Sequence, residues 1–265
     1  MDSQPEKAAV HVVSSVPRVR IGDALVDSYR FHEVIDVIVR HAIAGGAPKY
    51  VVTPNAQHIV LLAGDEYLRR IYSEAAFVLP DGMSLLFAAR LLGQIIPHRL
   101  AGVDVFDVLC GQAAQHELRI FLLGGRPGSA ERAAAKLQFR YPGLLVSGVC
   151  CPPVGFEKDE RQRRAAELQI QAANPHLLFV GLGAPKQEYW IYENARKLRV
   201  PIAMGVGGSF EMVGGVVKRA PLAVQRMGCE WLYRLLLEPQ RMWRRYLIGN
   251  LRFVSLVLQQ RLDMR

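Results

Sequence analysis

Short apolar runs alternate with stretches of helical periodicity over most of the chain. The runs are three to five residues long and rich in Val, Ile, Leu and Phe, which is typical of buried strands. They cover residues 50–53, 76–79, 119–123, 144–146, 176–180 and 201–204. Between them, apolar residues recur at helical spacing in 31–44, 83–92, 130–139 and 160–173. Because strands that alternate with helices pair in parallel and are covered on both faces, we predict an α/β fold with an open, mostly parallel sheet.

The alternation divides the chain into three parts. Residues 1–16 show neither period, and we expect a flexible N-terminal arm there. Residues 17–215 carry all six apolar runs and form the predicted α/β core. From residue 216 to residue 265 the pattern is helical, without a further strand-like run. We predict that this last part is a helical appendage on the core.

Positive charge is concentrated in the appendage. The whole chain has a formal net charge of +9, and residues 216–265 hold ten Lys or Arg against three acids. Trp231, Tyr233 and Trp243 are interleaved with these cations, as in helices that lie on anionic lipid. Two other interpretations stay open, a basic hairpin packed on the core and a homo-oligomer contact. No recognition motif favours a nucleic acid partner.

The composition also excludes several classes of protein and of metal or redox site. Apolar residues make up 51% of the chain, which excludes a disordered protein. The four cysteines and seven histidines show none of the spacings of zinc ligands or of a redox pair. We therefore expect neither a bound metal nor a cofactor.

Glycine-rich turns follow two of the predicted strands and open helices. The first is Gly124-Gly125-Arg126-Pro127-Gly128, and the second runs over 181–188; a third glycine cluster spans 205–208. Backbone N–H groups of such turns approach a phosphate closely, and the helix dipole favours its charge, although each turn alone also serves tight packing. Parallel strands end at one edge of a sheet, so we predict a diphosphate site there. Its expected substrate-binding residues are Gly124, Gly125, Gly183 and Lys186.

Asp81 is the most distinctive acid of the sequence. It follows an apolar run and precedes Gly82, where partial desolvation raises the pKa of a carboxyl toward that of a general base. The alternative is an N-cap for the helix over 83–92, because Asp is a favoured cap. Thr53 and Asn55 at a neighbouring strand end either line the same site or serve the turn. Gln187 either contacts a sugar or lies on the surface of a helix.

Eight ordered motifs occupy most of the chain. They are Thr53-Pro54-Asn55, Leu79-Pro80-Asp81-Gly82, 122–131, Tyr141-Pro142-Gly143-Leu144, 180–188, 205–210, Lys218-Arg219-Ala220-Pro221, and 230–234 with 238–241. Together they resemble the motifs of the WecG/TagA/CpsF glycosyltransferases, over about residues 19–252.

The resemblance implies a Rossmann-like core and an inverting glycosyltransferase with a UDP-sugar as donor. The acceptor would be a saccharide on a polyprenyl diphosphate, used in bacterial exopolysaccharide or cell-wall polymer assembly. The enzyme would be peripheral, at the cytoplasmic face of the inner membrane, with the appendage docked on anionic lipid of the inner leaflet. Asp81 would be the base, and Thr53, Asn55 and Gln187 would line the pocket. Arg234, Arg241 and Arg244 of the appendage would face the diphosphates.

Two features bear on the donor. TagA-like sequences read Ala-Asp-Gly-x-Gly-Val-Val around the acid, whereas this chain reads Pro80-Asp81-Gly82-Met83-Ser84-Leu85-Leu86, so UDP-glucose and UDP-N-acetylmannosamine both stay open. The chain also has no Asp-x-Asp pair, which holds a divalent cation in many transferases. We therefore expect arginines and backbone N–H groups to meet the charge of departing UDP. The alternative function is a non-catalytic nucleotide-binding protein associated with the membrane.

Overall fold

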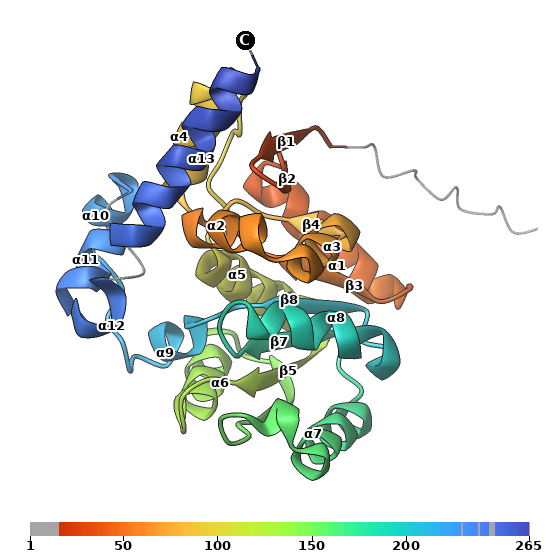
Figure 1. The fold of residues 1–265 in the computed structure, drawn as a ribbon. Helices are drawn as coiled ribbons and strands as arrows, with labels where there is room; N and C mark the ends of the chain where they lie inside the picture. The colour runs from red at the N-terminus through yellow and green to blue at the C-terminus, as the bar shows by residue number, and fades with distance from the viewer. Residues whose placement is uncertain (1–15, 229, 238, 244–246, 265) are drawn as a thin grey trace, which may run out of the picture.

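The computed structural model describes residues 16–228, 230–237, 239–243 and 247–264 (Figure 1). Within these ranges, the side chains of Arg226, Arg234, Arg241 and Met242 are not described. Of the predicted N-terminal arm only Val16 belongs to the described residues, so the arm stays a prediction.

Six parallel strands form the central sheet, in the order β4-β3-β8-β7-β5-β6. They are β3 (Lys49–Val52), β4 (Phe77–Val78), β5 (Arg119–Gly124), β6 (Leu145–Cys150), β7 (Leu177–Gly181) and β8 (Ile202–Gly205). Each strand overlaps one of the six predicted apolar runs, although β6 continues four residues beyond the run over 144–146. The predicted α/β fold with a mostly parallel sheet is therefore confirmed.

Helices cover both faces of the sheet (Figure 1). One face carries α1 (Phe31–Ala44), α5 (Gly102–Gln115), α6 (Ser129–Arg140) and α9 (Ser209–Val213). The other carries α2 (Ala56–Gly64), α3 (Glu66–Glu74), α7 (Glu160–Ala173) and α8 (Lys186–Leu198), whereas α4 (Met83–Leu91) lies beyond this layer against residues 18–21. In β7, Leu177 and Phe179 pack on the first face, and Leu178 and Val180 on the second. This alternation explains why β7 carries apolar residues at successive positions.

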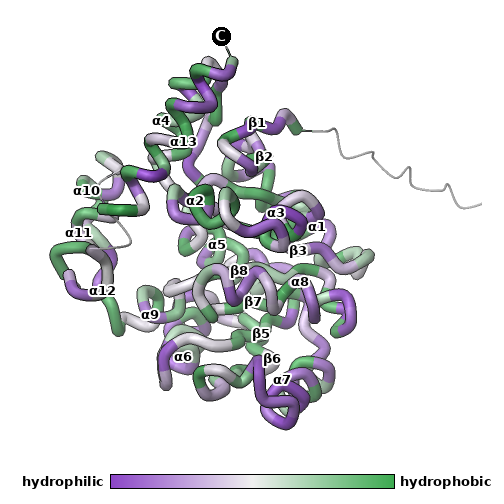
Figure 2. The backbone as a smooth tube through the Cα atoms, in the orientation of Figure 1, coloured by the Kyte–Doolittle hydropathy of each residue, from purple (hydrophilic) through white to green (hydrophobic). Residues whose placement is uncertain are grey.

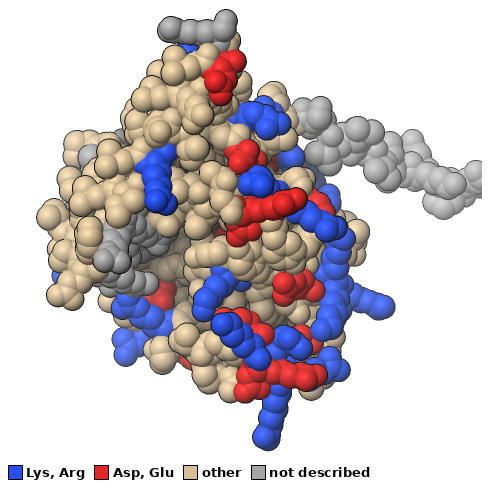
Figure 3. Space-filling model, viewed as in Figure 1, with Lys and Arg blue, Asp and Glu red and all other residues tan. Residues whose placement is uncertain are grey.

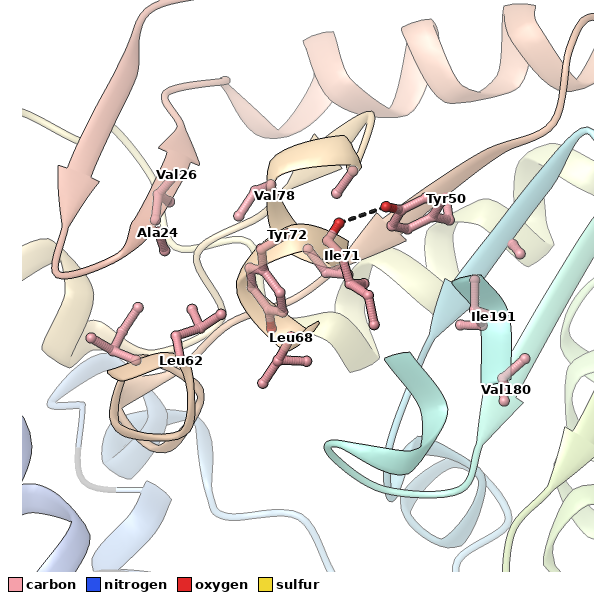
Figure 4. Packing of buried hydrophobic residues seen from close by; sticks show 14 of the residues in the cluster. Ala24, Val26, Tyr50, Leu62, Leu68, Ile71, Tyr72, Val78, Val180 and Ile191 are labelled. Carbon is pink, nitrogen blue, oxygen red and sulfur yellow. Dashed lines mark hydrogen bonds between the residues drawn. The ribbon is translucent and has the colours of Figure 1, made fainter. Parts of the chain in front are cut away.

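The core on the α2–α3 side joins strand and helix residues that are far apart in sequence (Figure 4). Tyr50 of β3 lies among them, and its hydroxyl donates to the Ile71 carbonyl of α3 at 2.5 Å. The bond gives a buried phenol its partner, so the aromatic ring adds to the apolar core without leaving a polar group unpaired.

A small antiparallel hairpin, which the sequence pattern did not predict, precedes the sheet. Its strands are β1 (Arg18–Ile21) and β2 (Ala24–Asp27). The Asp27 carboxylate accepts from Arg18 Nε within the hairpin and from the Val78 N–H of β4, both at 2.7 Å. One buried acid thus fixes the hairpin beside the edge of the main sheet.

The described elements after residue 216 are all helices, as predicted. They are α10 (Leu222–Arg226), α11 (Glu230–Leu237), α12 (Pro239–Trp243) and α13 (Gly249–Asp263). Helix α13 packs along α2 and buries Phe253 and Val257 in the core. Near its end, Gln260 accepts from the Gly22 N–H at 2.8 Å and donates to the Arg20 carbonyl at 3.0 Å, which ties it to the hairpin. Among the described residues, no helix has the length and apolar character that a membrane crossing requires.

Candidate active site

The carboxyl ends of β3, β4, β7 and β8 open onto one cavity of about 610 Å³. Loop and helix residues that follow these strands line it: Thr53, Asn55, His58, Asp81, Gly183, Gln187 and Gly207. Of the residues singled out in the sequence, the structure thus brings together Thr53, Asn55, Asp81, Gly183 and Gln187. Open parallel sheets bind their ligands at this edge.

Asp81 is held at the cavity wall by hydrogen bonds to the beginning of α5 and to the loop after β3. Its carboxylate accepts the Gly102 N–H, at the beginning of α5, at 3.1 Å, and its own N–H donates to the Pro54 carbonyl at 2.9 Å. The N-cap of α4 is Gly82, and no side chain bonds there. The alternative role of Asp81 as the cap of the helix over 83–92 is therefore wrong.

The electrostatics of Asp81 favour a carboxyl that takes up a proton easily. Burial raises the pKa of the Asp81 carboxyl above its ordinary value, and the nearby charge of Glu230 adds to the rise. Arg99 and the Gly102 N–H oppose the shift, and His58 opposes it less. The net pKa is raised, which is the direction that a general base at neutral pH requires.

Thr53 lies where β3 comes close to the start of α5. Its hydroxyl donates to the Gly205 carbonyl of β8 at 3.5 Å, and the side chain is 7% exposed. A Cβ at Gly102 would lie 3.1 Å from Thr53 Oγ1. Glycine at this position therefore lets the helix end, with its N–H for Asp81, approach Thr53.

Asn55 is both the N-cap of α2 and part of the cavity wall. Its Oδ1 accepts the Gln57 N–H at 3.0 Å. His58 Nδ1 lies 3.2 Å from the Asn55 backbone N and 3.0 Å from Asn55 Oδ1. The other ring nitrogen of His58, Nε2, lies 3.7 Å from Glu188 Oε1.

Gln187 is buried, so its interpretation as a helix surface residue is wrong. Its Oε1 accepts the Gly207 N–H, and its Nε2 donates to Glu188 Oε1, both at 2.9 Å. Glycine at 205 makes room for it, since a Cβ there would lie 2.7 Å from Gln187 Nε2. The amide therefore joins the loop after β8 to α8 and holds this wall of the cavity.

Cations that sequence patterns did not single out as site residues lie beside the acid. Arg99 donates from Nε to the Asp81 carbonyl at 2.7 Å, and its guanidinium pairs with Glu230 of α11. Arg219 pairs with both oxygens of Asp104, at 2.5 and 2.8 Å, and its Nε lies 3.5 Å from Glu230. Glu230 thus lies between the two guanidinium groups. Arg219 belongs to a quoted motif, but no local pattern marks Arg99.

Gly124, Gly125 and Lys186 are not brought into the cavity, although Arg126 of the first glycine turn lines it. Gly124 and Gly125 are not among the described residues that line it, and the Gly125 N–H already donates to the Gly181 carbonyl at 2.8 Å. The next N–H, of Arg126, donates to Glu211 at 2.9 Å. Lys186 is exposed and pairs with Glu157 at 3.2 Å. The turn around Gly124 therefore serves packing against β7 in this structure.

Three further predicted residues cannot be placed at the site. The side chains of Arg234 and Arg241 and the whole of Arg244 lie outside the described residues. Their assignment to the diphosphates stays a prediction. In the part of the chain that the structure describes, no three His, Cys, Asp or Glu side chains are grouped as metal ligands would be.

Residues 19–265 match the model of the glycosyl transferase WecG/TagA/CpsF family. The chain belongs to this family. The match covers the hairpin, the sheet, every wall of the cavity and the C-terminal helices. The resemblance predicted from eight motifs is confirmed, and with it the prediction that this protein is a glycosyltransferase.

Curated relatives of this glycosyltransferase share one name, N-acetylglucosaminyldiphosphoundecaprenol N-acetyl-beta-D-mannosaminyltransferase. The chain is 34% identical over 213 residues to the one from Bacillus subtilis (strain 168), which covers 80% of each chain. It is 33% identical over 210 residues to the one from Bacillus spizizenii (strain ATCC 23059 / NRRL B-14472 / W23), covering 79% of each. With the protein of Staphylococcus aureus (strain MRSA252) it shares 29% over 212 residues, covering 79% of this chain and 78% of the relative.

Proposed function

We propose that this glycosyltransferase moves a sugar from a UDP-sugar to a saccharide carried on a polyprenyl diphosphate. The observation that carries the proposal is the position of Asp81. This carboxyl has a raised pKa, is held by the Gly102 N–H, and lies in the wall of a cavity large enough for a nucleotide sugar.

The names of the relatives favour particular substrates. They are named for transfer of an N-acetylmannosamine unit to N-acetylglucosaminyl-diphosphoundecaprenol. We extend the lipid-linked acceptor to this chain and favour UDP-N-acetylmannosamine over UDP-glucose as its donor. The polymer would belong to cell-wall or exopolysaccharide assembly.

The proposed chemistry is a single displacement with inversion. An acceptor hydroxyl oxygen attacks the anomeric carbon, and the bond from that carbon to the UDP oxygen breaks on the opposite face. The hydroxyl proton passes to the Asp81 carboxylate, and the bonding electron pair leaves with UDP. Asp81 must therefore be ionised when the acceptor arrives, and its raised pKa makes it the stronger base once it is.

Cations of the chain would stabilise the departing diphosphate. Arg99, Lys218 and Arg219 line the cavity, and guanidinium groups bind phosphate oxygens in pairs. We propose that Arg234, Arg241 and Arg244 join them when the substrates are bound. Glu230 would have to give up its contacts with Arg99 and Arg219 for both guanidinium groups to reach the phosphates.

We further propose that residues 216–265 act as a membrane-docking appendage at the cytoplasmic face of the inner membrane. Large apolar side chains are exposed along it, among them Leu222, Met227, Leu236, Leu251 and Leu262, each more than 60% exposed. In Figure 3 few charged side chains lie over α13, in the upper left of the view, and most of them lie in the lower right. Because α13 also contributes Phe253 and Val257 to the core, point substitutions test this proposal more cleanly than a deletion.

The deciding experiment offers the purified full-length chain a panel of UDP-sugars, with N-acetylglucosaminyl-diphospho-polyprenol as acceptor. We expect one UDP-sugar to be transferred at least ~10-fold faster than its epimers, because pocket hydrogen bonds select among them. UDP binding, measured by calorimetry, accompanies the assay. UDP that binds without transfer of any sugar would support a non-catalytic nucleotide-binding protein and overturn the proposal.

A further inference from the structure

One half of the cavity is lined by apolar side chains. The proposed function assigns no role to this half. It is bounded by α4 on one side and by α13 on the other, and Trp231 of α11 also lines it. We call this half the apolar groove and define it by Phe87, Ala88, Leu91, Phe253, Val254 and Val257.

On each helix that borders the groove, the apolar residues lie on one face and form a continuous apolar stripe. On α4, Phe87 and Leu91 are four residues apart and therefore lie on one face, with Ala88 beside them. On α13, Phe253, Val254 and Val257 repeat at the three- and four-residue spacing of one face. Figure 2 shows apolar positions along both helices. Two apolar faces thus border the same space.

The groove has a buried floor and an exposed rim. Ala88, Phe253 and Val257 are only 3–6% exposed and belong to the core. Phe87, Leu91 and Val254 are 54%, 47% and 50% exposed, although all three are large and apolar. Large apolar side chains exposed in a row are costly in water and mark a binding surface.

The groove is continuous with the acid end of the cavity. Arg99 bonds the Asp81 carbonyl at one end and pairs with Glu230 of α11 at the other. The turn before α11 lies against α4, since a Cβ on Gly228 would be only 2.8 Å from the Cβ of Met83. The lining therefore changes from carboxylate to guanidinium to apolar side chains within one cavity.

We propose that the apolar groove binds the first isoprene units of the polyprenyl chain of the acceptor. The inference rests on the proposed function and deepens it. A polyprenyl diphosphate saccharide has a sugar, two phosphates and a branched hydrocarbon chain in that order. The cavity offers a base, cations and an apolar groove in the same order. The nucleoside of the donor is polar and does not suit these stripes, and burying each CH₂ of the chain is favourable.

The test measures chain dependence without a membrane. Two water-soluble acceptors are compared, N-acetylglucosamine diphosphate carrying either a two-isoprene chain or a methyl group. The proteins are the full-length wild type, the rim variants Phe87→Asp and Leu91→Asp, and Val254→Asp on the facing helix. Ile95→Asp is the matched control, because Ile95 is 77% exposed, lies four residues after the end of α4 and is not among the residues that line the cavity.

We expect the wild type and Ile95→Asp to prefer the isoprenoid acceptor by at least ~10-fold in kcat/KM. In the three groove variants the preference should fall to within about 2-fold, because a carboxylate in the groove repels the chain. The Kd for UDP should stay unchanged in all five proteins, which shows that each is folded with an intact polar end.

A wild-type preference near one, or a preference that survives in the groove variants, would overturn the inference. So would loss of co-sedimentation with phosphatidylglycerol vesicles in the groove variants with the chain preference intact, since the groove would then face bilayer lipid. If the wild type transfers sugar to neither acceptor, the proposed function itself fails.

Discussion

The carboxylate of Asp81 and the backbone N–H of Gly102 lie 3.1 Å apart, so the acid at the end of β4 is directed at the beginning of α5. An anion is favoured at a helix N-terminus, yet burial is the larger effect and raises the pKa of this carboxyl. The hydrogen bond therefore fixes the position of the Asp81 carboxyl, while its raised pKa still allows the carboxyl to take up a proton.

Replacing Asp81 by Asn should remove proton uptake while keeping the oxygen that accepts from Gly102. We expect the transfer rate to fall by about 100-fold or more, with an unchanged Kd for UDP. Asp36→Asn, on the exposed face of α1, is the charge-matched control and should keep the rate. Near-normal turnover in Asp81→Asn would show that the acid is structural.

The raised pKa of Asp81 also predicts how stability depends on pH. A pKa that is raised on folding adds stability that is complete below the unfolded-state pKa of ~4, and this stability is lost as the pH rises through the folded-state pKa. At pH 7 the wild type therefore bears the cost of a partly buried charge that Asp81→Asn lacks. The variant should unfold at a higher temperature at pH 7, with the difference vanishing near pH 3, as followed by circular dichroism. A lower unfolding temperature at pH 7 would contradict the assigned cause.

A substitution of Gln187 by Glu should destabilise the fold in a pH-dependent way. It places a second carboxylate 2.9 Å from Glu188 Oε1 in a buried site, where two ionised acids repel. We expect a loss of several degrees in the unfolding temperature at pH 8 and partial recovery at pH 5. Gln171→Glu on the exposed face of α7 should change little. Equal stability of both variants at pH 8 would argue against the buried amide contact.

The ion pair between Asp104 and Arg219 should couple the core to the segment before α10. A double-mutant cycle with Asp104→Asn and Arg219→Gln should give a coupling of about 1 kcal/mol or less in urea unfolding, because both partners are partly exposed. The coupling should shrink at 1 M salt. A cycle on the more exposed pair of Arg70 and Glu74 should give a smaller value. Zero coupling at low salt would mean that the contact does not hold this segment.

Chelation of divalent cations should leave transfer intact. Arg99, Lys218 and Arg219 already line the cavity, so we expect the rate in EDTA to lie within about 2-fold of the rate in magnesium. Arg99→Gln should lower the rate by at least ~10-fold under both conditions. An enzyme that loses its activity in EDTA and regains it with manganese or magnesium would refute the cation assignment.

The sequence predicted most of the sheet well because β3, β4, β5, β7 and β8 are largely buried, so their runs stand out as uninterrupted apolar segments. The edge strand β6 is more exposed, and the predicted run over 144–146 covers only its beginning. The hairpin was missed for the opposite reason. Its strands are four residues long, and Asp27, which pairs with Arg18 and β4, reads as an exposed acid.

The site was predicted only as far as its groups are local in sequence. Asp81 and Asn55 follow strands directly, but Arg99 reaches Glu230 across 131 positions, and nothing near it in the chain signals that pairing. Gln187 appeared ambiguous because its burial depends on Gly205 on another strand. Long-range contacts of this kind have no periodic signature.

Helix α13, which closes one side of the cavity, is the last of the described elements to be synthesised. The sheet and the acid can be in place on the ribosome before this wall exists, since parts of a chain fold as they emerge. A nascent chain would then present Asp81 to water with no hydrocarbon wall opposite α4. The cavity gains this wall only when α13 packs on α2 and Gln260 bonds to the turn at Gly22, so the proposed binding of the acceptor would depend on contacts between distant parts of the described fold.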